Sequence, residues 1–306
     1  MTRILLYWNH ICILHKHEKI FLERLASRLK PEGIELVVRY FGLGYPEHMS
    51  EYLARPDAVL PDMIVSADLE VFEDNRIFQK LKKTLYPAAV WVELRPGRAL
   101  EEVYRGEYLL PFLSIPLVYY TRNPASCAEK PCAEVEGLAF GGINNSAGKT
   151  LVKAVWSRYG KETALCLLKT AEVSDMPIGA FQQVRSGQST TALVPSLYAL
   201  RADGVQSFLI QPKEGPLLIP SYLCVRNSVP EEAARRLAAE ILSPELCGFY
   251  AEQGDLILHP ACTDKRSRQE GDRYFTPSGE WYNEIPSSEF YALYCSALPS
   301  ALDPFI

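Results

Sequence analysis

The stretch GGINNSAGKT at residues 141–150 raises the question of a phosphate-binding loop, because it ends in Gly-Lys-Thr. A phosphate-binding loop needs a glycine five positions before the glycine of its Gly-Lys-Thr end, because the backbone turns there to wrap N–H groups around the anion. Five positions before Gly148 stands Ile143, whose β-branched side chain resists the positive φ that such a turn often requires. The stretch therefore predicts no nucleotide-hydrolysing site. It predicts a strand, a polar turn and a helix N-terminus whose free N–H groups could hold an anion.

Metal-binding side chains are concentrated only just after the first apolar run, at His10, Cys12, His15 and His17. His15 and His17 lie two residues apart on a predicted helix, so they point to different faces. We therefore expect no metal site there. His10 keeps its interest because it stands at a strand end.

The eight cysteines are scattered, and none belongs to a Cys-x-x-Cys pair. We expect free buried thiols, as in a reducing compartment, rather than zinc ligands or redox pairs. Cys12 and Cys127 have no histidine partner at a predictable position, so neither is expected to be a catalytic nucleophile. No catalytic residue, metal or cofactor is predicted.

Length and charge narrow the class of protein. The 306 residues exceed one typical domain and fit two. Lys and Arg total 32 against 37 Asp and Glu, and no basic run interleaves with aromatic residues, so nucleic acid is not an expected partner. No apolar stretch approaches the roughly 20 residues that span a bilayer, so no direct membrane insertion is expected. The apolar run at 4–8 is too short for a secretion signal, so we expect either a cytoplasmic protein or one whose leader has been removed.

Hydrophobic periodicity predicts a first α/β unit near the N-terminus. A strand at 4–8, a helix at about 15–29 and a strand at 34–40 form a parallel βαβ unit, and a further strand follows at 63–65. The run at 117–124 is rich in β-forming residues, and we expect the chain to cross there into a second unit.

The second unit is expected from 137 to about 216, where strands again alternate with helices. The chain then returns through 217–225 to a long helix at 231–242. We expect the aromatic and proline-rich tail, from about 260 onward, to pack over the first unit.

Three segments carry a resemblance to a known family. They are PDMIVSADLEVF at 61–72, LPFLSIPLVYYTRN at 110–123, and 207–254, which begins SFLIQPKEG and ends FYAEQG. The third combines a strand, a Pro-Lys-x-Gly turn, a return strand, a helix rich in Ala and Arg, and Leu-Ser-Pro-Glu before a helix that ends in Gly. The sequence resembles the solute-binding proteins of ABC importers, in the extracellular family 1 or class II periplasmic type that serves iron(III), oxyanions and related ligands.

The resemblance implies an α/β, two-lobed class II periplasmic-binding-protein fold. Each lobe would be a mainly parallel sheet flanked by helices, and the chain would cross the hinge twice. Lobe 1 would comprise 1–118 plus 224–306, and lobe 2 would comprise 119–223.

The resemblance also implies a function. The protein would capture a small polar or anionic ligand, such as an oxyanion, an iron(III) complex or a small carboxylate, by hinge closure around an interlobe cleft. It would act as a monomer in the periplasm or at the cell surface and pass its ligand to ABC permease subunits. An enzyme on the same scaffold and a cytoplasmic ligand sensor are the alternatives.

Open parallel sheets bind ligands beyond the carboxyl ends of their strands. The predicted strand ends, together with one crossing tyrosine, give the following candidate ligand-binding residues: Asn9, His10, Ser66, Ala67, Asp68, Tyr119, Asn144, Asn145, Ser146, Ser196 and Tyr198.

Several of these residues have simpler structural explanations. Asp68 and the polar run at 144–146 are good helix caps. Tyr119 lies in the segment 117–124 where the chain is expected to cross between units, and its side chain could simply pack there. Tyr198 stands where iron(III)-binding members of the family present a pair of ligating tyrosines. Its neighbour here is Leu197, so direct iron coordination is not expected.

Overall fold

The computed structural model describes residues 1–42, 44, 45, 47–258 and 273–303. This part of the chain forms two compact units. Of the described residues, unit 1 contains 1–114, 220–252 and 256–258, and unit 2 contains 115–219, 253–255 and 273–303. None of the helices in these residues is long and apolar enough to span a bilayer.

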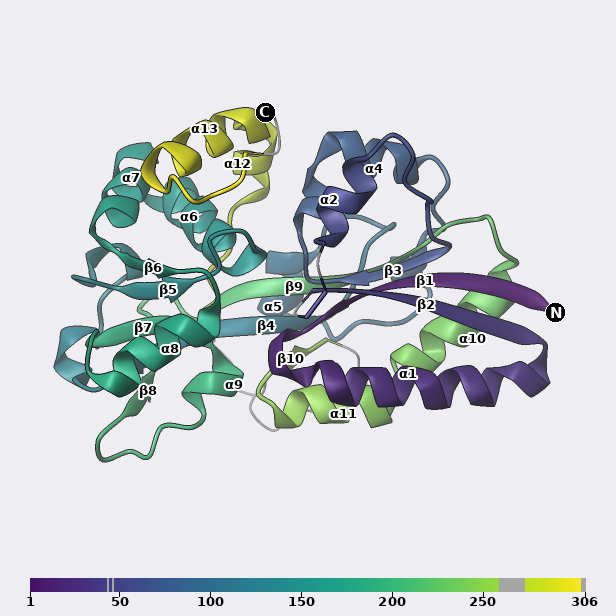
Figure 1. The fold of residues 1–306 in the computed structure, drawn as a ribbon, viewed down its shortest axis with the longest axis horizontal. Coiled ribbons are helices and arrows are strands. Elements are labelled where there is room, and N and C mark those ends of the chain that lie inside the picture. The colour runs from purple at the N-terminus through teal and green to yellow at the C-terminus, as the bar shows by residue number, and fades with distance from the viewer. Residues whose placement is uncertain (43, 46, 259–272, 304–306) are drawn as a thin grey trace. The chain divides into compact units, whose positions relative to one another are not determined.

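Unit 1 is built on a sheet whose first three strands are parallel. Strand β1 pairs with β2 on one side and with β3 on the other, and β9 runs antiparallel to β3. Figure 1 shows α1, α10 and α11 on one face of these strands and α2 and α4 on the other. The elements are β1 (Thr2–His10), α1 (His15–Leu29), β2 (Ile34–Gly42), α2 (Met49–Ala54), β3 (Met63–Ser66), α3 (Glu70–Glu73), α4 (Asn75–Lys82), α5 (Arg98–Val103), α10 (Glu231–Ile241), α11 (Pro244–Glu252) and β10 (Leu256–Ile257).

Unit 2 repeats the same design. Strand β5 lies between β6 and β7 and is parallel to both, and β4 runs antiparallel to β7 and β8. Helix α8 packs against β5 and β7, and α6 packs against β5 and α7. The elements are β5 (Ala139–Gly141), α6 (Ser146–Tyr159), α7 (Lys161–Thr170), β6 (Glu172–Ser174), α8 (Pro177–Ser186), β7 (Thr191–Pro195), α9 (Ser196–Ala199), β8 (Phe208–Ile210), α12 (Gly279–Glu284) and α13 (Ser287–Ala297).

Two long strands carry the chain from one unit to the other. They are β4 (Leu110–Thr121), where the chain leaves unit 1 after Ser114, and β9 (Leu217–Val225), where it returns at Pro220. The two strands are neighbours in the sheet. The expected α/β class, with mainly parallel strands flanked by helices, is confirmed.

The expectation that the tail packs over unit 1 is wrong for residues 273–303, which belong to unit 2. Helix α13 packs against α7, and Trp281 of α12 meets Trp156 of α6 with ring centroids 5.8 Å apart. The physical reason lies in α6, where every residue from Ser146 to Trp156 is buried. A helix buried all round needs cover on the side that faces away from the sheet, and the tail supplies part of it. The tail residues 259–272 and 304–306 lie outside the described part.

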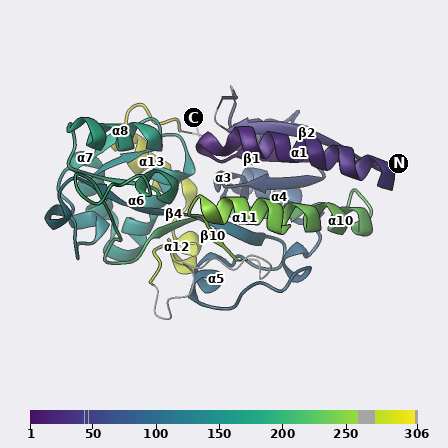
Figure 2. The same ribbon diagram turned by 90° about the horizontal axis from the view of Figure 1, so that it is seen from below.

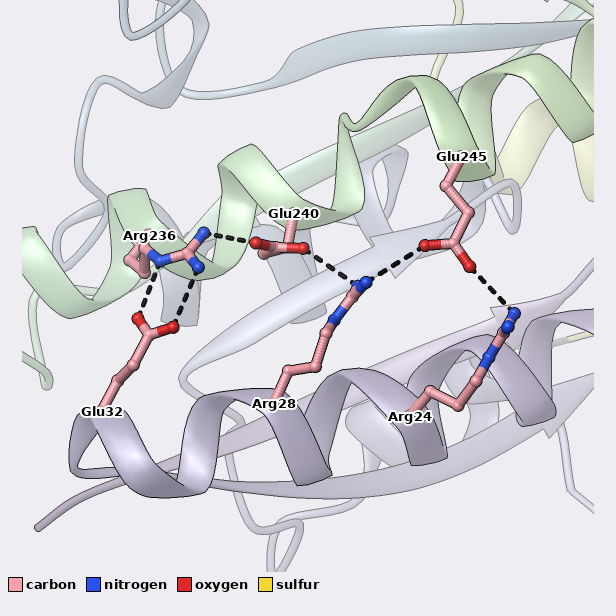
Figure 3. A network of polar contacts seen from close by, with 6 residues as sticks. All are labelled: Arg24, Arg28, Glu32, Arg236, Glu240 and Glu245. Carbon is pink, nitrogen blue, oxygen red and sulfur yellow. Dashed lines mark hydrogen bonds and ion pairs between the residues drawn. The ribbon is translucent and has the colours of Figure 1, made fainter.

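A chain of ion pairs joins α1 to α10 and α11 in unit 1 (Figure 3). Figure 2 shows these helices side by side. Arg236 sits between Glu32 and Glu240, and its hydrogen bonds lower the pKa of Glu32 below the ordinary 4.5. The pKa of Glu32 is therefore lower in the folded than in the unfolded chain, so the Glu32–Arg236 ion pair stabilises unit 1 above pH 4.5. This stabilisation is lost as the pH falls through the folded-state pKa. The members are Arg24, Arg28, Glu32, Arg236, Glu240 and Glu245.

Candidate functional site

The ends of β1 and β3 bring the first two groups of predicted residues together. The parallel register pairs Trp8 with Val65, so the next residues of each strand lie side by side. Asn9 and Ser66 therefore lie side by side, and His10 and Ala67 follow them where the two strands end. Asp68 follows directly.

The polar groups after β3 are engaged within unit 1. The hydroxyl oxygen of Ser66 accepts a hydrogen bond from the Asp68 N–H at 2.9 Å. The Asp68 Oδ2 accepts from the backbone N–H of Ser50 at 3.1 Å and from its hydroxyl at 2.8 Å. Asp68 thus binds the first turn of α2. It does not cap α3, the next helix, which was the simpler structural explanation for this residue.

His10 is held by a buried carboxylate that sequence reasoning did not single out. Its Nδ1 lies 2.5 Å from Glu18 Oε2, and both side chains are almost fully buried. The Tyr250 hydroxyl donates to Glu18 Oε1 at 2.6 Å, and the Ile11 N–H lies 3.3 Å from both oxygens. A carboxylate accepts hydrogen bonds, so His10 Nδ1 donates to Glu18 as Tyr250 and Ile11 do. The other imidazole nitrogen, Nε2, has no hydrogen-bond partner among the described residues.

A signal for Glu18 was present in the sequence. Glu18, Phe21, Leu22, Leu25 and Leu29 recur at helical spacing and form the buried stripe of α1. A carboxylate on an apolar stripe is rarely buried unless it has partners.

The ring of His10 is surrounded by other rings. It stacks on Tyr40 with centroids 4.9 Å apart and lies 5.7 Å from Tyr45, and the ring of His15 meets it edge-on at 6.0 Å. His10 Nε2 and His15 Nδ1 are both buried and have no hydrogen-bond partner among the described residues. His17 stacks on Phe249 instead, so the two neighbouring histidines of α1 do face different ways.

The side chain of Cys12 lies outside the described residues. Within the described part, no group of three or more His, Cys, Asp or Glu side chains is arranged to hold a metal ion.

The polar turn after β5 in unit 2 is occupied by the chain itself. Asn145 caps α6, with its Oδ1 accepting from the Ala147 N–H at 2.9 Å. Asn144 Oδ1 accepts from the Leu302 N–H at 2.8 Å, and its Nδ2 donates to the Ser300 carbonyl at 3.4 Å. Asn144 therefore fastens the C-terminal segment to this turn.

Gly141 and Gly148 of GGINNSAGKT allow neighbouring backbone segments to pack closely together. A Cβ on Gly141 would lie 2.3 Å from the backbone of Met176 and Pro177, where α8 begins. Gly142 has a φ of 101°. A Cβ on Gly148 would lie 2.7 Å from the Gly142 carbonyl, so the first turn of α6 sits directly on the loop. Lys149, which would be the phosphate-binding lysine of a nucleotide loop, is buried with its Nζ 5.1 Å from the ring centroid of Tyr291.

The remaining candidates in unit 2 are buried. The Ser196 hydroxyl donates to the Gly254 carbonyl at 2.9 Å. Tyr198 belongs to the core and stacks on Phe181 with centroids 5.5 Å apart. The Tyr119 hydroxyl donates to the Lys130 carbonyl at 3.2 Å, and burial raises its pKa far above the ordinary value. Tyr119 therefore stays protonated.

Comparison with known proteins identifies the fold. No protein-family model and no curated sequence matches the chain. Iron-bound HitA from Pseudomonas aeruginosa matches over 97% of this chain and 100% of its own, with 17% identity and a TM-score of 0.70. The chain has the fold of a class II periplasmic solute-binding protein. Two further solved structures have the same fold. The Bordetella ferric binding protein matches over 96% of this chain and 98% of its own, with 13% identity and a TM-score of 0.64. An ABC-transporter substrate-binding protein from Agrobacterium tumefaciens matches over 98% of this chain and 96% of its own, with 13% identity and a TM-score of 0.60.

The solute-binding-protein fold agrees with the resemblance carried by 61–72, 110–123 and 207–254. Within this fold the strand ends remain the predicted ligand-binding positions. Only one of the predicted residues there combines deep burial with a polar atom that lacks a partner among the described residues, namely His10.

Proposed function

We propose that the chain captures a small polar or anionic solute for an ABC importer. Support comes from the fold and from the solved proteins that share it, whose descriptions include iron-bound and ferric binding proteins and an ABC-transporter substrate-binding protein. The solute class is an oxyanion, an iron(III) complex or a small carboxylate. The protein acts as a monomer and meets permease subunits as its partner.

The observation that carries this proposal is the orientation of His10. Glu18 fixes the imidazole through Nδ1 and leaves Nε2 buried at the end of β1, beside the end of β3. A buried polar atom without a partner is costly, and a bound solute would supply one. Asn9, next to His10 on the same strand end, is the second expected contact in unit 1.

The burial of Cys127, a candidate nucleophile, favours binding without catalysis. Cys127 is fully buried, and desolvation raises its pKa, so the thiolate that attacks substrates is disfavoured.

We propose β4 and β9 as the strands about which the two units move when solute binds, because they are the two long strands that connect the units.

Isothermal titration calorimetry on purified, metal-free protein tests the proposal. Phosphate, molybdate, citrate and iron(III) citrate are titrated separately, and at least one is expected to bind with one site per chain. Replacement of His10 by Asn retains a donor near the Nδ1 position and removes Nε2, so we expect H10N to weaken that solute at least tenfold, or about 1.4 kcal/mol.

The matched control is His17→Gln, since His17 lies close to His10 in the sequence, on α1, but its ring packs on Phe249. Its affinity should stay within about twofold of the original. Turnover of any of these compounds by the unmodified protein would reject a purely binding role.

A further inference from the structure

We propose that the captured solute is a planar aromatic acid, whose ring stacks on Tyr45 and whose carboxylate or hydroxyl group binds His10. This rests on the proposed function and narrows its class of small carboxylates to those with a flat, unsaturated ring. It concerns unit 1 alone, because the residues come from the end of β1, from β2 and from the turn that follows β2.

Three rings are stacked at this end of the sheet. The ring centroid of Tyr40 lies 4.9 Å from that of His10, and the two planes are inclined at only 9°. The ring of Tyr45 lies 5.7 Å from His10 and 6.0 Å from Tyr40, with inclinations of 24° and 30°. Offset stacking with centroids about 4.5–7 Å apart is a favourable arrangement of π systems. The nearly parallel planes set the orientation in which a further flat ring would join them.

Tyr45 is the member of this stack that is open to solvent. His10 is 5% exposed and Tyr40 is half-buried, whereas Tyr45 is 37% exposed. The Tyr45 N–H donates to the Gly42 carbonyl at 3.0 Å, so a tight turn directly after β2 holds the residue in place. An aromatic side chain that is stacked on one side and open to solvent is available to a second stacking partner.

The position of the stack agrees with the place where a solute is expected. Strands β1 and β2 are parallel, with Trp8 paired to Tyr40 and His10 paired to Gly42. Tyr45 therefore lies just beyond the carboxyl ends of two neighbouring strands, where open parallel sheets bind their ligands.

The polar atom of the stack selects the groups that the ring must carry. His10 donates from Nδ1 to Glu18 at 2.5 Å, and its buried Nε2 has no hydrogen-bond partner among the described residues. Such an atom is costly until a ligand satisfies it. A neutral imidazole accepts at Nε2 from a hydroxyl, and a protonated one donates there to a carboxylate. Aromatic hydroxy acids carry both groups on the rim of one flat ring.

Isothermal titration calorimetry of the metal-free, full-length protein with benzoate, salicylate and 4-hydroxybenzoate tests the inference. At least one of these acids should bind with one site per chain. It should bind at least about fivefold more tightly than cyclohexanecarboxylate, which carries the same acid on a ring that is neither flat nor unsaturated. It should also bind more tightly than benzylamine, which keeps the aromatic ring and replaces the acid by a cation.

Substitutions at Tyr45 locate the stacking face. Tyr45→Ala should weaken the aromatic acid at least about fivefold and abolish its advantage over cyclohexanecarboxylate. Tyr45→Phe retains the ring and should recover most of the affinity that alanine loses. The matched control is Tyr104→Ala, since Tyr104 is another exposed tyrosine of unit 1 but follows α5 rather than a strand end. It should leave the affinity unchanged.

Any of three results would contradict the stacking site. The first is that none of the aromatic acids binds at concentrations up to about 10 mM. The second is equal or tighter binding of cyclohexanecarboxylate or benzylamine, and the third is binding of the aromatic acid that Tyr45→Ala leaves unchanged. Failure here is separable from failure of solute capture, because phosphate, molybdate and citrate have no ring and can bind when the aromatic acids do not.

Discussion

Replacing Glu18 with alanine will lower the free energy of unfolding by about 3–5 kcal/mol, because three buried donors lose their shared acceptor, at a cost of about 1–3 kcal/mol for each unsatisfied group. The carboxylate is fully buried and accepts from His10 Nδ1, the Ile11 N–H and the Tyr250 hydroxyl. Alanine removes the acceptor that all three share and leaves a cavity between α1 and α11. Urea unfolding followed by circular dichroism measures the loss.

Two milder variants calibrate this result. Glu18→Gln keeps the shape and one acceptor oxygen, so it should cost less, about 1–3 kcal/mol. Tyr250→Phe removes the hydrogen bond that the Tyr250 hydroxyl donates to the Glu18 carboxylate and should cost about 1.5–3 kcal/mol. If E18A unfolds at the same urea concentration as the unmodified protein, the three hydrogen bonds are not formed in solution.

Replacing Gly141 with alanine will destabilise unit 2 by about 3 kcal/mol, toward the upper end of overpacking effects. The added Cβ would lie 2.3 Å from the carbonyl carbon and oxygen of Met176 and from the Pro177 nitrogen. These are backbone atoms at the start of α8 and cannot rotate away, so β5 and α8 must separate. Urea unfolding is again the measurement.

Gly248→Ala is the matched control for the glycine substitution. Gly248 lies inside α11 with open space around the position of its missing Cβ. Alanine there should raise stability by about 1 kcal/mol, because it favours the helix and meets no neighbour. A G141A protein as stable as G248A would contradict the close approach of β5 to α8.

The first unit could be predicted from the sequence because its signals are local. The expected strand, helix and strand at 4–8, 15–29 and 34–40 correspond to β1, α1 and β2. The apolar stripe of α1 and the turn at Gly33, whose φ is 81°, mark the helix and its end without reference to distant residues.

The position of the tail could not be predicted in this way. Leu302 donates to Asn144 across 158 residues of sequence, and no local pattern records such a contact. The tail is apolar and aromatic enough to pack on either unit. What decides its position is the burial of α6 on every side, and this becomes visible only when the helices are placed.

The strand ends that the sequence predicts after 4–8 and 63–65 are present as the ends of β1 and β3. That these two strands are neighbours is known only from the structure. The sequence could not show that Asp68 is engaged by Ser50, or that Asn144 holds the C-terminal segment. Each of these polar residues had two plausible roles, and only the hydrogen-bond partners distinguish between them.

Native mass spectrometry of gently purified, tag-free protein tests most directly whether this chain carries a solute through His10. We predict that the unmodified protein and H17Q retain one small molecule, ion or metal complex per chain, and that H10N loses it. Retention of the same mass by H10N, or an unmodified protein that never carries or binds a solute, would contradict the account.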